Sequence, residues 1–234
     1  MNQALILAGG LGTRLRPIVK TLPKPLARIN NRPFLEYQLD FCIKNDIQKV
    51  YLSVGYLKEK IISHFGNCYK SIKIDYISED KPLGTGGALI KALKNFKNDF
   101  FVLNGDSYFD INLKKFYELH RFRKSLWSIA LFESSDTDRY SSVKINSLNQ
   151  ILSFGNQKTN KDVFVNGGIY IINSRIFDSL ELPLDTKISL EKDILPNLIS
   201  SGKEIYGFKF EGYFTDIGIP ADFKSAASNL DIFN

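Results

Sequence analysis

The sequence contains very little cysteine and histidine. Its 234 residues include two cysteines, Cys42 and Cys68, and two histidines, His64 and His120. Two isolated cysteines are too few for a disulfide framework or for a thiolate metal site. No grouping of histidine with serine or cysteine suggests an activated nucleophile. The chemistry of the chain is therefore expected to rest on other residue types.

Long apolar runs and one-sided charge are also missing. No stretch reaches the ~18 consecutive apolar residues that a membrane-spanning helix needs. The chain begins directly with a strand-like run and has no basic and apolar leader, so we expect a cytoplasmic protein with no membrane partner. Lysine and arginine number 31 against 25 aspartates and glutamates, a net charge of +6, and the lysines are scattered. A basic stripe for nucleic acid is therefore not expected.

The sequence does contain a dense glycine-rich stretch near its start. The first apolar run predicts a buried strand, and Gly9, Gly10 and Gly12 follow it. Glycine lets the backbone come close to a ligand, and successive free N–H groups in such a loop bind anions. Arg14 adds a fork of donors suited to phosphate oxygens, and Lys24 adds a second cation. These residues together predict a site for a polyphosphate.

Two better-known glycine loops do not fit this stretch. A P-loop would end in Gly-Lys-Ser/Thr, whereas Gly12 is followed by Thr13 and Arg14. The dinucleotide-binding fingerprint would place a third glycine where Leu15 stands. The predicted phosphate site is thus of another kind.

The stretch resembles the signature of the sugar-1-phosphate nucleotidyltransferases, Gly-Gly-x-Gly-Thr-Arg-Leu-x-Pro followed by Pro-Lys-Pro. Here it occupies residues 9–17 and 23–25, and further motifs extend the resemblance over most of the chain. The resemblance implies catalytic roles for Arg14, Lys24 and Asp106. The nucleotide-binding residues that it implies are Leu7, Gly9, Gly10, Gly12, Thr13, Arg14, Glu79, Pro82, Gly84 and Thr85.

Strand-like and helix-like segments alternate through the first half of the chain. Strands are expected at 3–8, 49–54, 72–77, 100–103 and 128–132, and helices at 33–45, 58–65, 87–95 and 113–124. The second half is richer in strands, at 142–145, 151–154 and 164–172, with helices at 174–180 and 190–200. Segments 204–210, 213–216 and 220–230 are expected to finish the sheet and add a closing helix.

This order predicts an α/β fold with a mixed, mostly parallel central sheet and helices on both faces. Together with the resemblance, it indicates a single Rossmann-like domain over residues 1–234. Residues 1–132 are expected to bind the nucleotide and residues 133–234 the sugar phosphate. The C-terminal β-helix domain of some family members is not expected.

Two aspartates stand where strands are expected to end. Asp106 follows the buried run 100–103, and Asp216 lies in a Phe-Thr-Asp-Ile-Gly segment. Hard carboxylate oxygens suit Mg²⁺, which usually shares its shell with substrate phosphates. A turn or helix cap is the alternative reading of such an aspartate. The family places its two metal ligands in matching contexts, so the resemblance implies that Asp106 and Asp216 bind Mg²⁺.

Glu79 stands where thymidylyl- and uridylyltransferases of the family commonly have a glutamine. A carboxylate only accepts hydrogen bonds, so it suits N1–H and N2–H of guanine and meets a lone pair at adenine N1. Glu79 therefore favours GTP, and the Glu-x-x-Pro-Leu-Gly-Thr pattern resembles the guanylyl branch of the family. Some uridylyltransferases for muramic-type sugars also carry an acidic residue in this loop, so that alternative stays open.

The expected sugar-phosphate side lies in the second half of the chain. Asn166 to Gly168 resembles a sugar-binding Asn-Ala/Gly-Gly segment, although a β-bulge would also explain glycines within a strand. Glu191 and Lys192 resemble another sugar-contacting segment, which could instead be a charged first helical turn. Relatives tend to have Phe-x-Glu-Lys-Pro where residues 154–158 read Phe-Gly-Asn-Gln-Lys, so Lys158 is expected to replace the missing lysine.

The expected function is transfer of GMP from GTP to a sugar 1-phosphate, with release of pyrophosphate. Within the family the chain is most similar to the D-glycero-D-manno-heptose 1-phosphate guanylyltransferases. Mannose-1-phosphate guanylyl transfer and uridylyl or thymidylyl transfer are the alternatives. The resemblance implies GTP and a sugar 1-phosphate as partners, a homodimer as the assembly, and a role in making a capsule or another surface polysaccharide.

Overall fold

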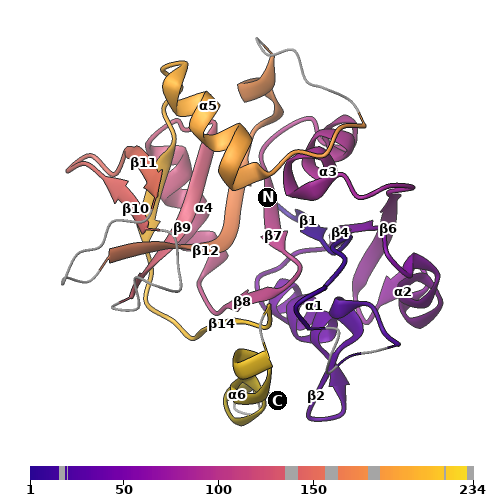
Figure 1. The fold of residues 1–234 in the computed structure, drawn as a ribbon. Coiled ribbons are helices and arrows are strands. Elements are labelled where there is room, and N and C mark those ends of the chain that lie inside the picture. The colour runs from indigo at the N-terminus through magenta and orange to yellow at the C-terminus, as the bar shows by residue number, and fades with distance from the viewer. Residues whose placement is uncertain are drawn as a thin grey trace.

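One continuous sheet organises the computed structural model (Figure 1). The structure describes residues 1–15, 19, 21–134, 142–155, 163–178, 185–218 and 220–230. The centre of the sheet is parallel: β1 (Gln3–Leu7) lies between β4 (Lys49–Val54) and β7 (Phe100–Asn104). Strand β6 (Ile72–Ser78) continues the parallel order beyond β4, and β5 (Cys68–Tyr69) closes that edge.

The second half of the chain extends the same sheet in mixed orientation. Strand β12 (Val163–Ile172) runs antiparallel to β7 and pairs with β9 (Trp127–Ser134) and β10 (Ser142–Ile145). Strand β11 (Ile151–Gly155) pairs with β10, and β13 (Tyr206–Lys209) runs parallel to β9. The expected mixed, mostly parallel α/β fold is confirmed.

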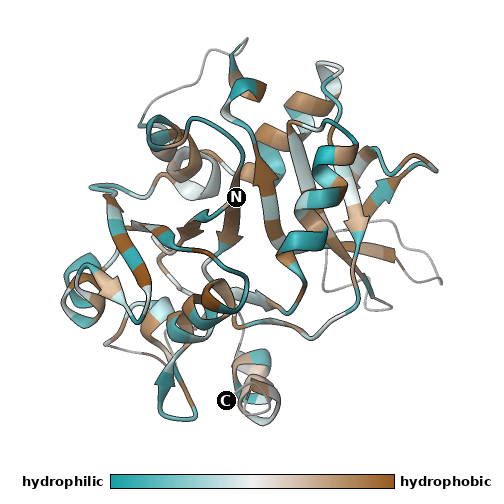
Figure 2. Ribbon diagram, turned by 180° about the vertical axis from the view of Figure 1, so that it is seen from behind, coloured by the Kyte–Doolittle hydropathy of each residue, from teal (hydrophilic) through white to brown (hydrophobic). Residues whose placement is uncertain are grey.

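Side chains of the central strands alternate between two cores, one on each face of the sheet. Ala4 and Ile6 of β1 belong to one core, and Leu5 and Leu7 belong to the other. Both faces are therefore apolar, and Figure 2 shows the central strands as largely hydrophobic. A strand buried on both faces is typical of a parallel sheet covered by helices on each side.

The helices divide between these two faces. Helices α1 (Phe34–Lys44), α2 (Lys58–Phe65), α4 (Leu113–Phe122) and α6 (Pro220–Leu230) pack into the first core. Helices α3 (Gly84–Ala92) and α5 (Leu195–Ser200) pack into the second. No helix in the described ranges is long and apolar enough to cross a bilayer.

Several segments differ from the sequence-based expectation. Helix α3 begins three residues earlier than expected, and the expected helix from 174 is a 3₁₀ turn over Ser174–Phe177. The helix expected at 190–200 opens as a π-turn, Leu190–Ile194. Strand β14 (Phe214–Asp216) does not finish the main sheet, because it pairs with the unexpected strand β8 (Ser107–Phe109) in a separate ribbon. The short hairpin of β2 (Arg28–Ile29) and β3 (Arg32–Pro33) was also not expected.

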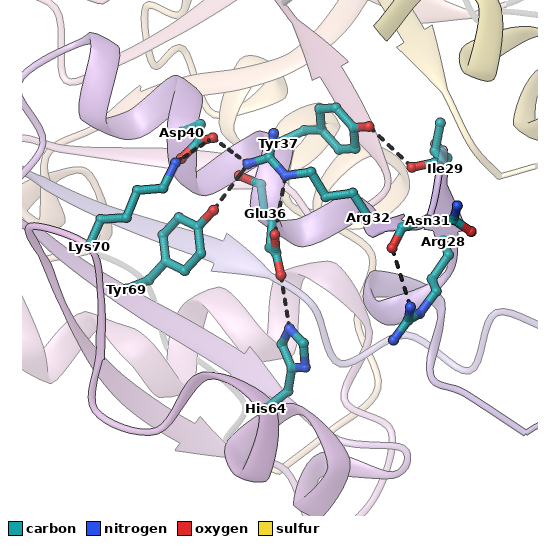
Figure 3. Close-up of polar contacts among 10 residues, drawn as sticks. All are labelled: Arg28, Ile29, Asn31, Arg32, Glu36, Tyr37, Asp40, His64, Tyr69 and Lys70. Carbon is teal, nitrogen blue, oxygen red and sulfur yellow. Dashed lines mark hydrogen bonds and ion pairs between the residues drawn. The ribbon is translucent and has the colours of Figure 1, made fainter. Parts of the chain in front are cut away.

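A charged cluster ties this hairpin to the rest of the fold (Figure 3). Arg32 donates to Glu36 and Asp40 of α1 and to the Tyr69 hydroxyl of β5. Lys70 pairs with Asp40 at 2.8 Å. Burial raises the pKa of the Asp40 carboxyl, but hydrogen bonds from Lys70 and Arg32 outweigh it and hold the pKa below its usual value. The cluster is thus a structural clamp at the edge of the molecule.

Candidate active site

A cleft of about 470 Å³ opens where the parallel strands β1, β6 and β7 end. The carboxyl ends of parallel strands share one edge of a sheet, and ligands commonly bind there in α/β folds. The residues that line the cleft are Leu7, Ala8, Gly9, Gly10, Leu11, Lys24, Pro25, Glu79, Pro82, Gly84, Thr85, Ala88, Asn104, Gly105, Asp106, Lys187, Glu191 and Asp216.

The glycine-rich loop forms one wall of the cleft. Gly9 allows a contact that no other residue could make, because a Cβ there would lie 2.4 Å from Oε1 of Glu79. Further along the loop, Gly12 has a φ of +57° and lies against the stem of Lys24. The loop therefore contacts both the predicted base-reading residue and the predicted catalytic lysine.

Lys24 and Asp106 form an ion pair inside the cleft. Lys24 Nζ lies 2.7 Å from Oδ2 of Asp106. The lysine side chain is 10% exposed and the aspartate side chain 40%. The pair holds a cation and an anion at the place where the sequence predicts phosphate and metal binding.

The two predicted metal-binding aspartates lie on neighbouring segments. Pairing of β8 with β14 places Ser107 opposite Asp216, and the Ile217 N–H donates to the Asp106 carbonyl at 2.8 Å. The turn that carries Asp106 is braced by Gln38, whose Nε2 donates to the carbonyls of Asn104 and Ser107. The unexpected β8–β14 ribbon is thus the element that brings the two carboxylates together.

The electrostatics of this pair fit a divalent cation. Burial raises the pKa of Asp216, and the negative charge of Asp106 raises it further, whereas Lys24, the Gly218 N–H and Arg14 lower it. A hard cation bound between two close carboxylates would relieve their mutual repulsion. Among the described residues no group of three or more acidic, histidine or cysteine side chains is placed to hold a metal ion.

The predicted base-reading loop closes another side of the cleft. Glu79 follows β6 and is only 6% exposed. Its Oε1 accepts from the Ser53 hydroxyl at 2.9 Å, and its Oε2 accepts from the Leu83 N–H at 3.1 Å. Gly84 and Thr85 then begin helix α3.

The start of α3 is tied to the segment before Leu190. The Ile188 N–H donates to the Leu83 carbonyl at 2.8 Å, and the Gly86 N–H donates to the Ile188 carbonyl at 2.9 Å. Gly84 has a φ of +72°, and a Cβ there would lie 2.4 Å from the Ile188 oxygen. The predicted base loop and the predicted sugar-side segment are therefore joined by backbone hydrogen bonds.

A chain of hydrogen bonds connects the predicted sugar-side residues. Asn166 Nδ2 donates to the Tyr170 hydroxyl at 2.7 Å, and that hydroxyl donates to Oε1 of Glu191 at 3.0 Å. Oε2 of Glu191 accepts from the Thr85 hydroxyl at 3.2 Å. Tyr170 is fully buried, and burial together with the charge of Glu191 raises its pKa well above the usual value. Its hydroxyl therefore stays protonated and orients Glu191, which lines the cleft.

Several predicted site residues lie away from the cleft wall. Gly12, Thr13, Arg14, Asn166, Gly168 and Lys192 are not among the lining residues, and Lys158 lies outside the described residues. Arg14 lies near Asp216, because its Nη2 would be 3.2 Å from a Cβ at Gly218. The register of β12 with β9 shifts between Asn166 and Tyr170, at the segment where a β-bulge was the alternative expectation.

Sequence reasoning missed two polar lining residues, Asn104 and Lys187. Five further lining residues were also not predicted as site residues: Ala8, Leu11, Pro25, Ala88 and Gly105. Asn104 ends β7 next to Asp106, and its position at a strand end in a polar turn was a usable signal. Lys187 lies in an irregular segment, and no pattern distinguished it from the other scattered lysines. Its place in the cleft adds a second cation beside Lys24.

Comparison with known proteins agrees with this geometry. The family model "Nucleotidyl transferase" matches residues 3–231. A D-glycero-alpha-D-manno-heptose 1-phosphate guanylyltransferase from Aneurinibacillus thermoaerophilus is 41% identical over 229 residues, covering 97% of this chain and 98% of the relative. A protein of the same name from Campylobacter jejuni is 40% identical over 221 residues, covering 94% and 96%. The crystal structure of HddC from Yersinia pseudotuberculosis superposes with a TM-score of 0.86 at 33% identity, covering 98% of this chain and 100% of that one.

The chain therefore belongs to the nucleotidyl transferase family. It is an enzyme, and its chemistry is nucleotidyl transfer to a sugar 1-phosphate.

Proposed function

We propose that this enzyme transfers GMP from GTP to D-glycero-D-manno-heptose 1-phosphate, releasing pyrophosphate and forming a GDP-heptose. The observation that carries the proposal is that one cleft is lined by the glycine loop, Lys24, Asp106, Asp216 and Glu79. Two relatives named as heptose 1-phosphate guanylyltransferases are about 40% identical over nearly the whole chain.

The choice of GTP rests on Glu79. Each carboxylate oxygen has two lone pairs and already accepts one protein donor, so one lone pair on each remains. That number suits the N1–H and N2–H of guanine. Adenine would place a lone pair against the carboxylate, and an unpaired buried acceptor costs about 1–3 kcal/mol. A crystal structure of the relative HddC holds GMP-PN, which agrees with a guanine nucleotide.

The transfer itself needs positioning and charge neutralisation. A sugar phosphate with a second pKa of about 6 is already ionised at neutral pH, so its oxygen attacks the α-phosphorus of GTP without a general base. The bond from the α-phosphorus to the bridging oxygen breaks, and pyrophosphate leaves. Arg14 and the loop N–H groups hold the outer phosphates, and Lys24 exchanges its contact with Asp106 for the phosphates that react.

Asp106 and Asp216 are the residues that would hold Mg²⁺. When bound, the ion supplies positive charge against the phosphate oxygens. The aspartates contribute by keeping two carboxylates on adjacent segments at the cleft floor. Arg14, beside Asp216, adds a positive charge on the same side.

The sugar phosphate is proposed to bind beside Glu191 and Lys187. Glu191 is held by the Tyr170 and Thr85 hydroxyls and offers its carboxylate to sugar hydroxyls. Lys187 lines the cleft and is suited to the sugar phosphate, together with Lys158. Asn166 donates to the Tyr170 hydroxyl that holds Glu191, and the Gly168 N–H donates to Asn166. The resemblance also assigns Lys192 to the sugar-phosphate site.

The decisive test is a matrix of Mg²⁺-dependent pyrophosphate release. GTP, ATP, UTP and TTP are each combined with heptose, mannose and glucose 1-phosphates. Turnover with GTP and the heptose phosphate is expected. GTP with mannose 1-phosphate alone would replace the heptose by mannose, and turnover with UTP or TTP would overturn the role of Glu79. The same preparation measured by light scattering tests the expected homodimer.

A further inference from the structure

Ser53 is a fully buried polar residue whose hydroxyl contacts the predicted base-reading residue. It is the penultimate residue of β4, and its neighbours Leu52 and Val54 are both buried in the apolar core. Its hydroxyl donates to Oε1 of Glu79 at 2.9 Å. Burying a hydroxyl costs free energy unless the hydroxyl is hydrogen-bonded. The hydrogen bond from Ser53 to the Glu79 carboxylate offsets this cost.

We propose that Ser53 is a positioning residue for base selection, which fixes the Glu79 carboxylate so that both of its free lone pairs face the guanine edge. This inference rests on the proposed function, in which Glu79 contacts the base. Ser53 itself is fully buried, so it acts through Glu79 and does not touch the nucleotide.

Three groups confine the carboxylate. Ser53 donates to one oxygen, and the Leu83 N–H donates to the other at 3.1 Å. The backbone of Gly9 lies close to Oε1, since a Cβ there would approach that oxygen to 2.4 Å. The strand below is fixed too, because the Ala8 N–H donates to the Ser53 carbonyl at 2.9 Å. Rotation of the carboxylate would break one donor contact or the other.

The two donors differ in what they demand. The Leu83 N–H can only donate, so it always requires an oxygen from residue 79. The Ser53 hydroxyl can donate or accept, so it would tolerate either an oxygen or an amide nitrogen. Because residue 79 is a glutamate, the Ser53 hydroxyl donates to it. Both carboxylate oxygens of Glu79 then act only as acceptors. Ser53 thus sets the geometry of a two-point contact, and losing it leaves a carboxylate held at one oxygen.

The experiment compares GTP with inosine triphosphate, whose base lacks the N2 amino group and so makes only one of the two contacts. Ser53→Ala is measured beside Ser128→Ala, a control that removes another fully buried serine hydroxyl, paired with His120 far along the sheet. The readout is the ratio of kcat/KM for GTP to that for inosine triphosphate, with kcat recorded separately.

The ratio is expected to fall about fivefold in Ser53→Ala, through KM for GTP and with kcat little changed, and to stay unchanged in Ser128→Ala. An unchanged ratio in Ser53→Ala, or equal losses with both nucleotides, would overturn the inference. Ser53→Cys keeps the shape but offers only a weak donor, so it gives a second test in which the ratio is again expected to fall. If the enzyme without substitutions turned over UTP or TTP in preference to GTP, the proposed function would be refuted, whatever the two variants show.

Discussion

Lys24→Ala separates the catalytic and structural contributions of the cleft ion pair. The substitution removes the cation that lies 2.7 Å from Asp106 and leaves the backbone unchanged. A donor aimed at developing charge is worth about 10²–10³ in kcat. We therefore expect turnover at saturating substrates to fall by at least about 100-fold.

The effect on stability is expected to be small. The Asp106 side chain is 40% exposed, and an ion pair of this kind contributes at most about 1 kcal/mol. In a chain of 234 residues this corresponds to a change in Tm of about 2–4 °C. Thermal unfolding of the variant should therefore remain cooperative and close to that of the natural enzyme.

The same variant is expected to bind a divalent cation more tightly when no substrate is present. Lys24 occupies an oxygen of Asp106, so removing it frees that oxygen and removes a nearby positive charge. Titration with Mn²⁺ followed by electron paramagnetic resonance measures this affinity without turnover. Lys58→Ala is the control, because Lys58 pairs with the exposed Asp80 and lies outside the cleft lining.

Near-natural turnover in Lys24→Ala would refute the catalytic assignment. A loss of turnover accompanied by a large drop in Tm would show that the lysine is structural. Unchanged or weaker Mn²⁺ binding would show that Lys24 does not compete with a cation for Asp106.

Three further substitutions have predicted effects, at the glycine loop, in the charged clamp and at the buried tyrosine. Gly9→Ala should weaken GTP binding at least about tenfold by equilibrium titration, because its Cβ would collide with Glu79. Asp40→Asn should lower the free energy of unfolding at neutral pH. The loss should shrink as the pH falls below about 4, because the lowered pKa of Asp40 stabilises the fold only while the carboxyl is ionised; urea unfolding at several pH values measures this. Tyr170→Phe should cost about 1–3 kcal/mol in urea unfolding, since it removes a fully buried hydroxyl that is hydrogen-bonded to Asn166 and Glu191.

The main layers of the fold could be predicted from the sequence because periodicity reports burial. The β1 run is apolar from Ala4 to Leu7, and the structure buries these residues in a core on each face. The ribbon of β8 and β14 could not be predicted, since three-residue strands carry no periodic signal. A longer helix was expected where the structure has a 3₁₀ turn over Ser174–Phe177. A few apolar residues do not distinguish a 3₁₀ turn from an α-helix.

The site could be predicted where chemistry is concentrated in local motifs. The glycine loop, Lys24 and the region of Glu79 are contiguous signatures, and their lining residues meet in one cleft. The partners that hold these groups could not be predicted in the same way. Ser53 and Gln38 are single polar residues in apolar contexts, and only the packing of separate strands shows what they contact.

The backbone pairing between Leu83–Gly86 and Ile188 bears on how new specificities can be engineered. Each segment supplies a hydrogen-bond donor and an acceptor to the other, and Gly84 leaves no room for a side chain between them. Grafting one loop from a relative with another sugar preference would replace only one of the two paired segments. The backbone hydrogen bonds to the other segment would then be strained. Chimeras that exchange residues 82–88 and 185–191 together should keep the backbone pairing intact. The unit that can be swapped between relatives is thus a pair of distant segments, not either loop alone.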